Sequence, residues 1–272
     1  TMLWIHRVGL EHAKQFLLTG RAIDAATAHR IGLVSHVCDP DELADLVESE
    51  GTPDGAYKLA QLVRACRGLF DATRAYGTPL ISGKDSMKND YQIGDTKISI
   101  PPTLLFSVIG KIDDVRQATT MDAKHAGDLV YLLGRTDDEL GGSEYYALHG
   151  ELGANVPKID AARALERYRS VNAAQQQGLI ASCHDLSDGG LAVALAETAF
   201  AGGFGVDVCL GRLDAPSGLS AAALLFSESA SRLLVTVRPE HQAAFEALFA
   251  EQSCGCIGVV TATGDLRITG VR

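Results

Sequence analysis

The residues best suited to chemistry in this 272-residue chain lie in a polar loop that follows a short apolar run. Gly83 lets the backbone approach a ligand closely, and Lys84 can meet phosphate oxygens. Asp85 can meet Mg²⁺ and Ser86 can donate to an anion. The spacing is not that of a P-loop. The residues alone leave two interpretations open, a phosphate and metal site or a solvated turn.

A second polar loop carries two carboxylates three positions apart, Asp185 and Asp188, between an expected strand and an Ala-rich helix. Carboxylates at such a place suit a hard cation that is shared with phosphates, and a helix N-terminus favours an anion. The alternative is a helix cap, in which Asp188 or Ser187 satisfies free backbone amides. His184 by itself is more typical of a packed or capping histidine than of a base.

Two further polar runs are weaker candidates. Glu228 and Ser229 lie just before an expected strand, where they either bind a ligand or form a polar turn. The backbone amides of residues 141–144 either form an anion-binding nest or belong to a flexible linker. No Ser-His-Asp or Cys-His arrangement can be argued from the spacing of the residues.

The elements that must position these loops divide into two groups. A helix is expected from Thr52 and Pro53 to Gly77, with one apolar stripe at steps of three and four residues. Strands are expected at 78–82, 97–100, 103–112, 128–134, 179–183, 204–210, 232–237 and 255–261, and further helices at 160–177, 191–200 and 241–251. The first part is therefore strand-rich with one helix, and the second part alternates helices and strands.

Composition excludes several classes of function. The net charge is −10 without a block of Lys and Arg, so a nucleic-acid partner is not expected. No apolar run approaches the ~18 residues of a membrane span, and the first residues have no secretory apolar core. The six cysteines have no zinc spacing, which indicates a reduced, cytoplasmic protein.

Taken together, the motifs resemble one family. From residue 48 to residue 272 the chain is similar to the second half of phosphoribosylformylglycinamidine synthase, an ATP-dependent ligase of purine biosynthesis. The resemblance rests on segments that occur in the order that the family shows: 52–63, 82–90, 100–106, 141–143, 184–190 and 226–229. Five ordered motifs after the first helix are much more specific than any one of them.

The resemblance implies a fold and a reaction. The family converts formylglycinamide ribonucleotide, ATP and an ammonia donor to formylglycinamidine ribonucleotide, ADP and phosphate. Its two halves each resemble aminoimidazole ribonucleotide (AIR) synthetase. The expected class is therefore α+β, with a strand-rich subdomain at 48–120 that forms a barrel with a partner, and an α/β subdomain at 121–272.

The resemblance also implies roles for the candidate residues. It assigns Gly83 and Lys84 to ATP, Ser86 to the substrate and Asp185 to Mg²⁺. The cofactors would be Mg²⁺ and ATP or ADP. Further ligand contacts are expected from four other residues of the same loops: Asp85, Asp188, Glu228 and Ser229. The catalytic histidine of the family belongs to the first half, so no catalytic residue is expected in this chain, and the chain alone is expected to be inactive.

Partners follow from the same resemblance. A first-half synthase chain and a glutamine amidotransferase chain are expected, besides ATP and formylglycinamide ribonucleotide. The strands at 97–100 and 103–112 would have no partner within the chain, and a homodimer would close the barrel.

Two other interpretations stay open for the body of the chain. One is a non-catalytic nucleotide-binding module, and the other is a different enzyme of the superfamily, such as selenophosphate synthetase or thiamine-phosphate kinase. Residues 10–46 instead resemble the enoyl-CoA hydratase (crotonase) family. We interpret residues 1–47 as a fused helical extension rather than as a site of acyl-CoA activity.

Overall fold

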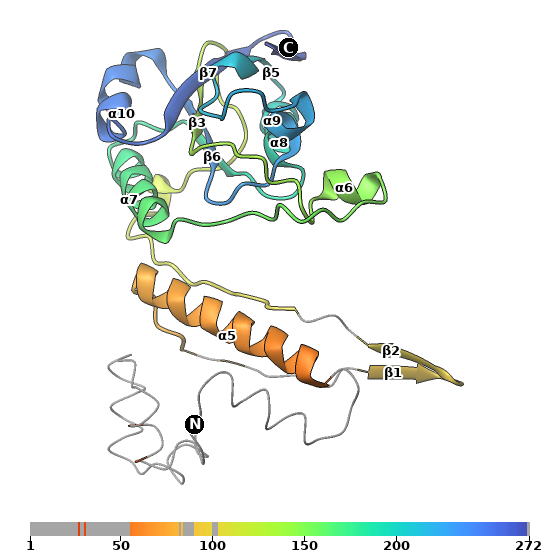
Figure 1. The fold of residues 1–272 in the computed structure, drawn as a ribbon. Helices are drawn as coiled ribbons and strands as arrows, with labels where there is room; N and C mark the ends of the chain where they lie inside the picture. Colours follow the sequence, from red (N-terminus) through yellow and green to blue (C-terminus); the bar gives the residue numbers. More distant parts are fainter. Residues whose placement is uncertain are drawn as a thin grey trace. The chain divides into compact units, whose positions relative to one another are not determined.

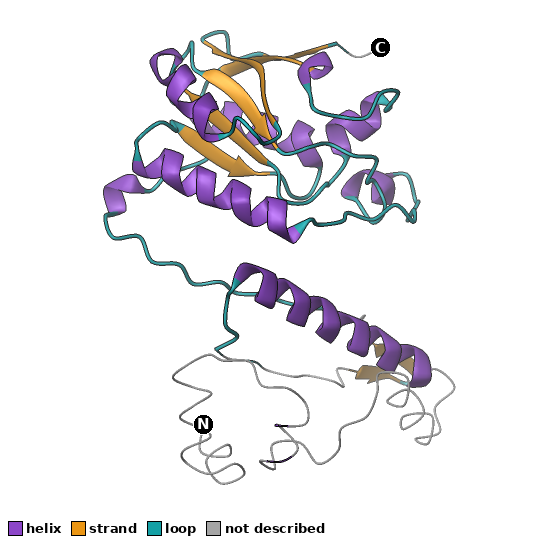
Figure 2. Ribbon diagram, turned by 60° about the vertical axis from the view of Figure 1, so that its left-hand side comes forward, coloured by secondary structure: helices purple, strands orange, loops and turns teal. Residues whose placement is uncertain are grey.

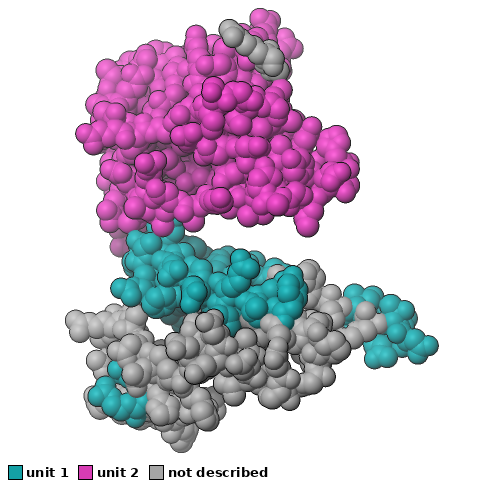
Figure 3. Space-filling view, in the orientation of Figure 1, with its two compact units in different colours: residues 1–109 teal, residues 110–272 magenta. Residues whose placement is uncertain are grey.

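A computed structural model describes residues 27, 30, 55–81, 83, 90–99 and 103–270. The chain divides into two compact units, Thr1–Ile109 and Gly110–Arg272, which Figure 3 colours separately. Thr27 and Arg30 are helical. The rest of the crotonase-like extension lies outside the described residues, as do Thr52 and Pro53.

The first unit contains the long helix α5 (Gly55–Tyr76). The helix ends as expected at Gly77, whose φ is 65°, and the amide of Thr78 donates to the carbonyl of Thr73 at 3.0 Å. The expected apolar stripe is only partly covered within the described residues. Leu62 is half-buried, whereas the side chain of Phe70 is 49% exposed.

A β-hairpin follows, formed by β1 (Asp90–Ile93) and β2 (Thr96–Ser99). Its two-residue turn is Gly94-Asp95, and Gly94 adopts a φ of 58° that suits such a turn. The strand expected at 97–100 is confirmed as β2. The expectation that it lacks a partner within the chain is wrong, because it pairs with β1 in antiparallel register.

Two other expected strands are not formed. Residues 78–81 have no strand geometry, and Leu80 and Ile81 are 58% and 78% exposed. Residues 103–112 also form no strand, and Leu105 and Ile109 are 91% and 87% exposed. Their composition favours strands, but that preference expresses fit to a pleated, half-buried surface. No described strand supplies that surface to either segment.

The second unit is built on a six-stranded sheet with the strand order β4-β6-β3-β7-β5-β8 (Figures 1 and 2). The pairs are antiparallel except for β5 and β8, which are parallel. The strands are β3 (Leu129–Leu133), β4 (Ser182–Asp185), β5 (Gly205–Cys209), β6 (Leu233–Val237), β7 (Cys254–Thr261) and β8 (Leu266–Thr269).

Helices cover both faces of this sheet (Figure 1). They are α7 (Ala161–Gln176), α8 (Gly190–Gly202), α9 (Ala221–Phe226) and α10 (Gln242–Leu248). The short helix α6 (Glu144–Leu148) lies to the side of the sheet, and 3-10 turns occur at Val115–Gln117, Leu210–Arg212 and Pro239–His241. The expected strand at 179–183 begins later, at Ser182. The other expected strands and helices of this unit are confirmed within a few residues.

Each face of the sheet has its own apolar core, and β3 contributes to both. Val130 and Leu132 pack with α8 on one face, whereas Tyr131 and Leu133 pack with α7 and α10 on the other. All four side chains are at most 2% exposed. The sequence of β3 is a continuous apolar run because a strand that is covered on both faces has no polar side. The sheet and its helices confirm the α+β class.

Candidate functional site

Three of the predicted polar loops meet at one end of the sheet, where β3 and β4 finish and β6 starts. Leu233, at the start of β6, pairs with Leu133 at the end of β3 and with Asp185 at the end of β4. The segments that follow β3 and β4 and the segment that precedes β6 therefore lie side by side. The sequence predicted each loop separately, and the sheet brings them together.

Glu228 connects these loops through hydrogen bonds to backbone groups. Its Oε1 accepts from the amide of Gly189 at 2.9 Å and from the amide of Glu144 at 3.1 Å. Its own amide donates to the carbonyl of Glu139 at 3.2 Å. The half-buried side chain of Glu228 thus joins the loop after β4 to the start of α6, and its backbone amide adds the segment after β3.

Four positions after Glu228 comes a buried arginine, Arg232, which is only 1% exposed. Its Nε donates to the carbonyl of Ser229 at 3.0 Å, Nη1 donates to Oγ1 of Thr136 at 3.0 Å, and Nη2 donates to the carbonyl of Ser227. Burial lowers its pKa to about 10, and the carboxylates of Glu139, Asp137 and Glu228 act in the opposite direction. The guanidinium stays charged at neutral pH and holds the 227–231 loop from the inside.

The serines of this loop bind backbone groups of the segment after β3. Oγ of Ser227 accepts from the amide of Glu139 at 3.2 Å, and Oγ of Ser229 accepts from the amide of Asp137 at 3.1 Å. Ser229 is only 3% exposed. The structure therefore gives Ser229 a structural contact, and its predicted contact with a ligand remains a prediction.

The loop also contains a strained residue. Ser231 has a φ of 60°, in the left-handed region that costs a residue other than glycine about 1–3 kcal/mol. Nη1 of Arg167 donates to the carbonyl and to Oγ of Ser231, both at 2.8 Å. Two arginines from different elements therefore fix the backbone between Ser227 and Arg232.

The carboxylates of the second motif are on the surface. Asp185 ends β4 with a side chain that is 73% exposed, and Asp188 is exposed as well. His184 is 11% exposed, with Nε2 2.8 Å from Oε2 of Glu197 and Nδ1 3.4 Å from Oδ1 of Asp185. The expectation of a packed histidine is thus confirmed. Asp185 is left with a carboxylate that faces solvent.

The alternative in which Asp188 or Ser187 caps α8 is wrong. The N-cap is Gly189, in left-handed conformation with a φ of 77°, and it makes no side-chain cap bond. The oxygen that meets its amide comes from Glu228, 39 positions later in the chain. Nothing in the local spacing of the motif indicates such a distant partner.

The anion nest predicted at residues 141–144 is also wrong. The amides of Gly141, Gly142 and Ser143 donate to carbonyls of Asn155, Leu152 and Leu140, at 2.7–3.1 Å, and the amide of Glu144 donates to Glu228. A Cβ on Gly141 would approach the backbone of Asn155 to within 2.7–2.8 Å, so this glycine permits a close approach of two chain segments. The segment is an ordered turn, and the flexible-linker interpretation is wrong too.

The first predicted motif lies mostly outside the described residues. Gly83 is exposed, and a Cβ built on it would meet no atom within 4 Å. Lys84, Asp85 and Ser86 are not described. Their predicted roles at ATP, at further ligand contacts and at the substrate therefore stay predictions.

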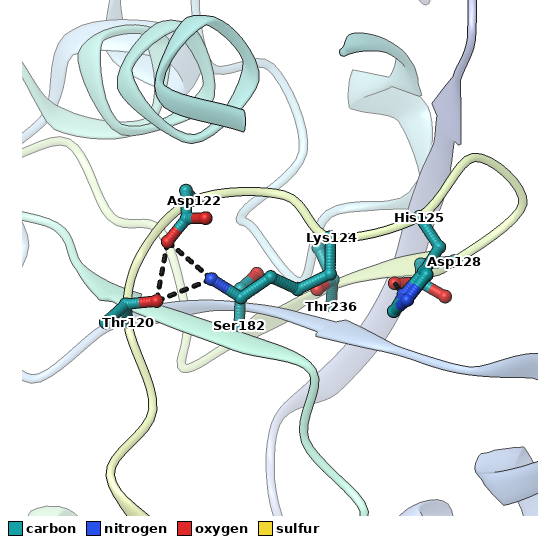
Figure 4. A network of polar contacts seen from close by, with 7 residues as sticks. All are labelled: Thr120, Asp122, Lys124, His125, Asp128, Ser182 and Thr236. Carbon is teal, nitrogen blue, oxygen red and sulfur yellow. Dashed lines mark hydrogen bonds and ion pairs between the residues drawn. The ribbon is translucent and has the colours of Figure 1, made fainter. Parts of the chain in front are cut away.

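A surface hollow of about 350 Å³ lies at the opposite end of the strands. It is lined by residues 124–125, 178–181, Arg238 and His241. Two of its polar side chains, those of Lys124 and His125, already have partners. Figure 4 shows Nζ of Lys124 between Oδ1 of Asp122 and Oγ1 of Thr120, each at 2.5 Å. Nδ1 of His125 lies 3.4 Å from Oδ2 of the buried Asp128. These mutual contacts favour a structural network over a binding site.

The described residues limit the kind of metal site that the unit can offer. They contain no group of three His, Cys, Asp or Glu side chains that could hold a metal ion. Proteins commonly bind Mg²⁺ through one or two carboxylates together with substrate phosphates, so the prediction for Asp185 does not require such a group. None of the described helices has the length and apolar character that a membrane crossing requires.

Residues 125–271 match the family model "AIR synthase related protein, C-terminal domain", which is more than half of the chain. The phosphoribosylformylglycinamidine synthase subunit PurL of Alkaliphilus metalliredigens (strain QYMF) is 41% identical over 194 residues, 71% of this chain and 25% of that protein. PurL of Thermobifida fusca (strain YX) is 45% identical over 205 residues, 74% of this chain and 25% of that protein.

A solved structure, that of T. maritima PurL complexed with FGAR, has a similar fold. Its TM-score is 0.51 at 19% identity, over 57% of this chain and 27% of that chain. The chain thus spans about a quarter of the length of the relatives that it matches. The solved structure shows that the fold is shared.

Proposed function

Because the chain belongs to the family of AIR synthase related proteins through residues 125–271, we propose that it is the second, nucleotide-binding half of a phosphoribosylformylglycinamidine synthase. The observation that carries the proposal is the 41–45% identity to two synthase subunits over about 200 residues. The complete reaction belongs to relatives about three times as long, so for this chain we assign the part that binds Mg²⁺ and nucleotide.

The geometry of the second unit supports this assignment. Asp185 presents an exposed carboxylate at the end of β4, beside the N-terminus of α8. A bound Mg²⁺ at this carboxylate would neutralise phosphate charge there. Gly83, Lys84 and Ser86 extend the proposed site by resemblance to the family, with ATP at the first two and formylglycinamide ribonucleotide at the third.

We also propose a partner for the exposed apolar segment at residues 103–112. In the family, strands of this subdomain close a barrel with those of another half, and a second copy of this chain would supply them. The strands β1 and β2 already pair with each other, so the exposed segment at 103–112 is the part that a second copy would cover. Light scattering at micromolar concentration should give about twice the mass of 28.8 kDa, and a single-chain mass would exclude the dimer.

Cytoplasmic location and the two further partners, a first-half synthase and a glutamine amidotransferase, come from the resemblance. The described cysteines support a reducing compartment, because Cys66, Cys183, Cys209, Cys254 and Cys256 are all free thiols.

The test of the nucleotide site is calorimetry with Mg-ADP on the full chain and on Asp185→Asn. The substitution keeps the shape of the side chain and removes the charge that meets the cation. We expect it to weaken binding by at least about 10–100-fold, which is the loss typical of residues that only support a metal ligand. Asp207→Asn, on β5 and remote from this edge, is the matched control. Equal heats for the native chain and Asp185→Asn would remove Asp185 from the site.

A further inference from the structure

We propose that Glu228 is a positioning residue, whose carboxylate clamps the loop that carries Asp185 to the start of α6. The ligand in this proposal rests on the proposed function, whereas the clamp rests on the contacts of Glu228 alone. From its sequence, Glu228 was expected either to contact a ligand directly or to belong to a polar turn. The structure assigns it to the backbone of the site.

The clamp consists of two bonds to one oxygen. Oε1 of Glu228 accepts from amides that lie 39 and 84 positions away, those of Gly189 and Glu144. Bonds to a charged acceptor are roughly twice as strong as neutral ones. The carboxylate also lies at the N-terminus of α8, where negative charge is favourable. Glu228 therefore supplies the cap that the 185–190 loop lacks.

The two sides of the clamp are held unequally. The 227–231 loop is held by Arg232, by Arg167 and by the serine bonds to the segment after β3. In the 185–190 loop, the amide of Leu186 donates to the carbonyl of Arg232 at 3.1 Å, whereas Asp185, Ser187 and Asp188 are exposed. Loss of the carboxylate should therefore loosen the 185–190 loop and leave the 227–231 loop in place.

Two substitutions separate a clamp from a ligand contact. Glu228→Gln keeps an oxygen that accepts both amides but removes the charge. Glu228→Ala removes both. A clamp requires the acceptor, so glutamine should restore what alanine loses. A direct contact with Mg²⁺ requires the charge, so glutamine should fail as alanine does.

The first experiment is amide hydrogen exchange on the full chain without nucleotide. In Glu228→Ala we expect residues 185–190 and 141–146 to exchange at least about tenfold faster than in the native chain, because a charged hydrogen bond is lost. Glu228→Gln should stay within about threefold of native rates. Glu166→Ala, an exposed glutamate of α7, is the matched control and should leave both loops unchanged. Native exchange rates in Glu228→Ala would overturn the clamp.

The second experiment is Mg-ADP calorimetry on the same variants. We expect Glu228→Ala to weaken binding about tenfold or more, as supporting residues of metal sites do, and Glu228→Gln to bind within about threefold of native. Equal losses in both variants would assign Glu228 to the ligand and overturn the proposal. If the native chain binds no Mg-ADP, the proposed function fails, and hydrogen exchange alone decides the clamp. If Glu228→Ala does not fold, Glu228→Gln decides: native protection supports the clamp and lost protection overturns it.

Discussion

Nη1 of Arg232 donates to Oγ1 of Thr136 at 3.0 Å, although the two residues are 96 positions apart and at most 1% exposed. The bond joins the residue before β6 to the segment after β3. Because both side chains are shielded from water, neither can exchange this partner for solvent. This buried bond therefore fixes the end of the sheet from which the loops extend.

Replacing Arg232 should test how much of the fold depends on this residue. Arg232→Met keeps much of the volume but leaves the carbonyls of Ser227 and Ser229 without their donor, so we expect a loss of about 3 kcal/mol in the free energy of unfolding. Urea denaturation measures it. Arg135→Met removes an exposed ion pair with Asp137 and should cost less than about 1 kcal/mol. Similar midpoints for the two variants would contradict the role of Arg232.

The contact between α8 and the 227–231 loop makes a prediction for Gly190. This residue has a φ of 60°, and a Cβ would collide with the carbonyl oxygen of Ser227 and approach that of Leu225 to 3.0 Å. Gly190→Ala should cost about 3 kcal/mol or more, from strain together with overpacking. Gly203→Ala has a φ of 72° and open space, so it should cost only about 1–2 kcal/mol. Equal costs would show that the loop yields to the added methyl group.

A substitution at the N-terminus of α7 should have a smaller effect on stability, and a closely matched control is possible there. Asp160 is the N-cap, and its Oδ1 accepts from the amide of Arg163 at 3.1 Å. Asp160→Ala should cost about 1 kcal/mol, whereas Asp160→Asn keeps an accepting oxygen and should cost only a few tenths. The exposed ion pair with Arg163 is lost in both, so it cancels. Thermal unfolding of the two variants measures the difference, and an equally low Tm for both would point to the charge instead.

Two half-buried thiols, Cys183 and Cys254, predict that the protein loses stability at alkaline pH. Burial raises the pKa of Cys183 to about 11 and that of Cys254 to about 12, from an ordinary value of 9.0. Above pH 9 the unfolded chain releases these protons while the folded chain keeps them, so the free energy of unfolding should fall as pH rises from 9 toward 12. Urea midpoints measured at pH 8, 9 and 10 give the slope. Cys183→Ala should flatten it, and an unchanged slope would assign the effect to other groups.

The second unit was largely predictable because its elements obey local rules. The buried run at Leu129–Leu133, the helix that begins at Asp160 and the glycine-bounded helix α8 each carry their signals within a few residues. The first unit, which we expected to be strand-rich, was not predictable in the same way. Leu105 and Ile109 favour strands by type, but a strand requires a partner, and the sequence does not state one.

The candidate site shows the same division between local and distant information. The position of Asp185 at a strand end was predicted, and so was a packed His184. The partners Glu197, Thr136 and Arg167 were missed, because each bond joins residues from 13 to 96 positions apart. The turn Gly94-Asp95 did carry a local hairpin signal, and β1 could have been found from it.

The strand order has a consequence for how the chain is made. β3 lies between β6 and β7, and Leu133 pairs with Leu233, a residue that is translated about a hundred positions later. At about 5–20 residues per second, the ribosome needs roughly 5–20 s to supply that partner. For this interval Leu129-Val130-Tyr131-Leu132-Leu133 is an apolar strand with both edges unsatisfied, which is a template for aggregation. Chaperone binding during synthesis should therefore concentrate on this pentapeptide, and its release should wait for β6 and β7.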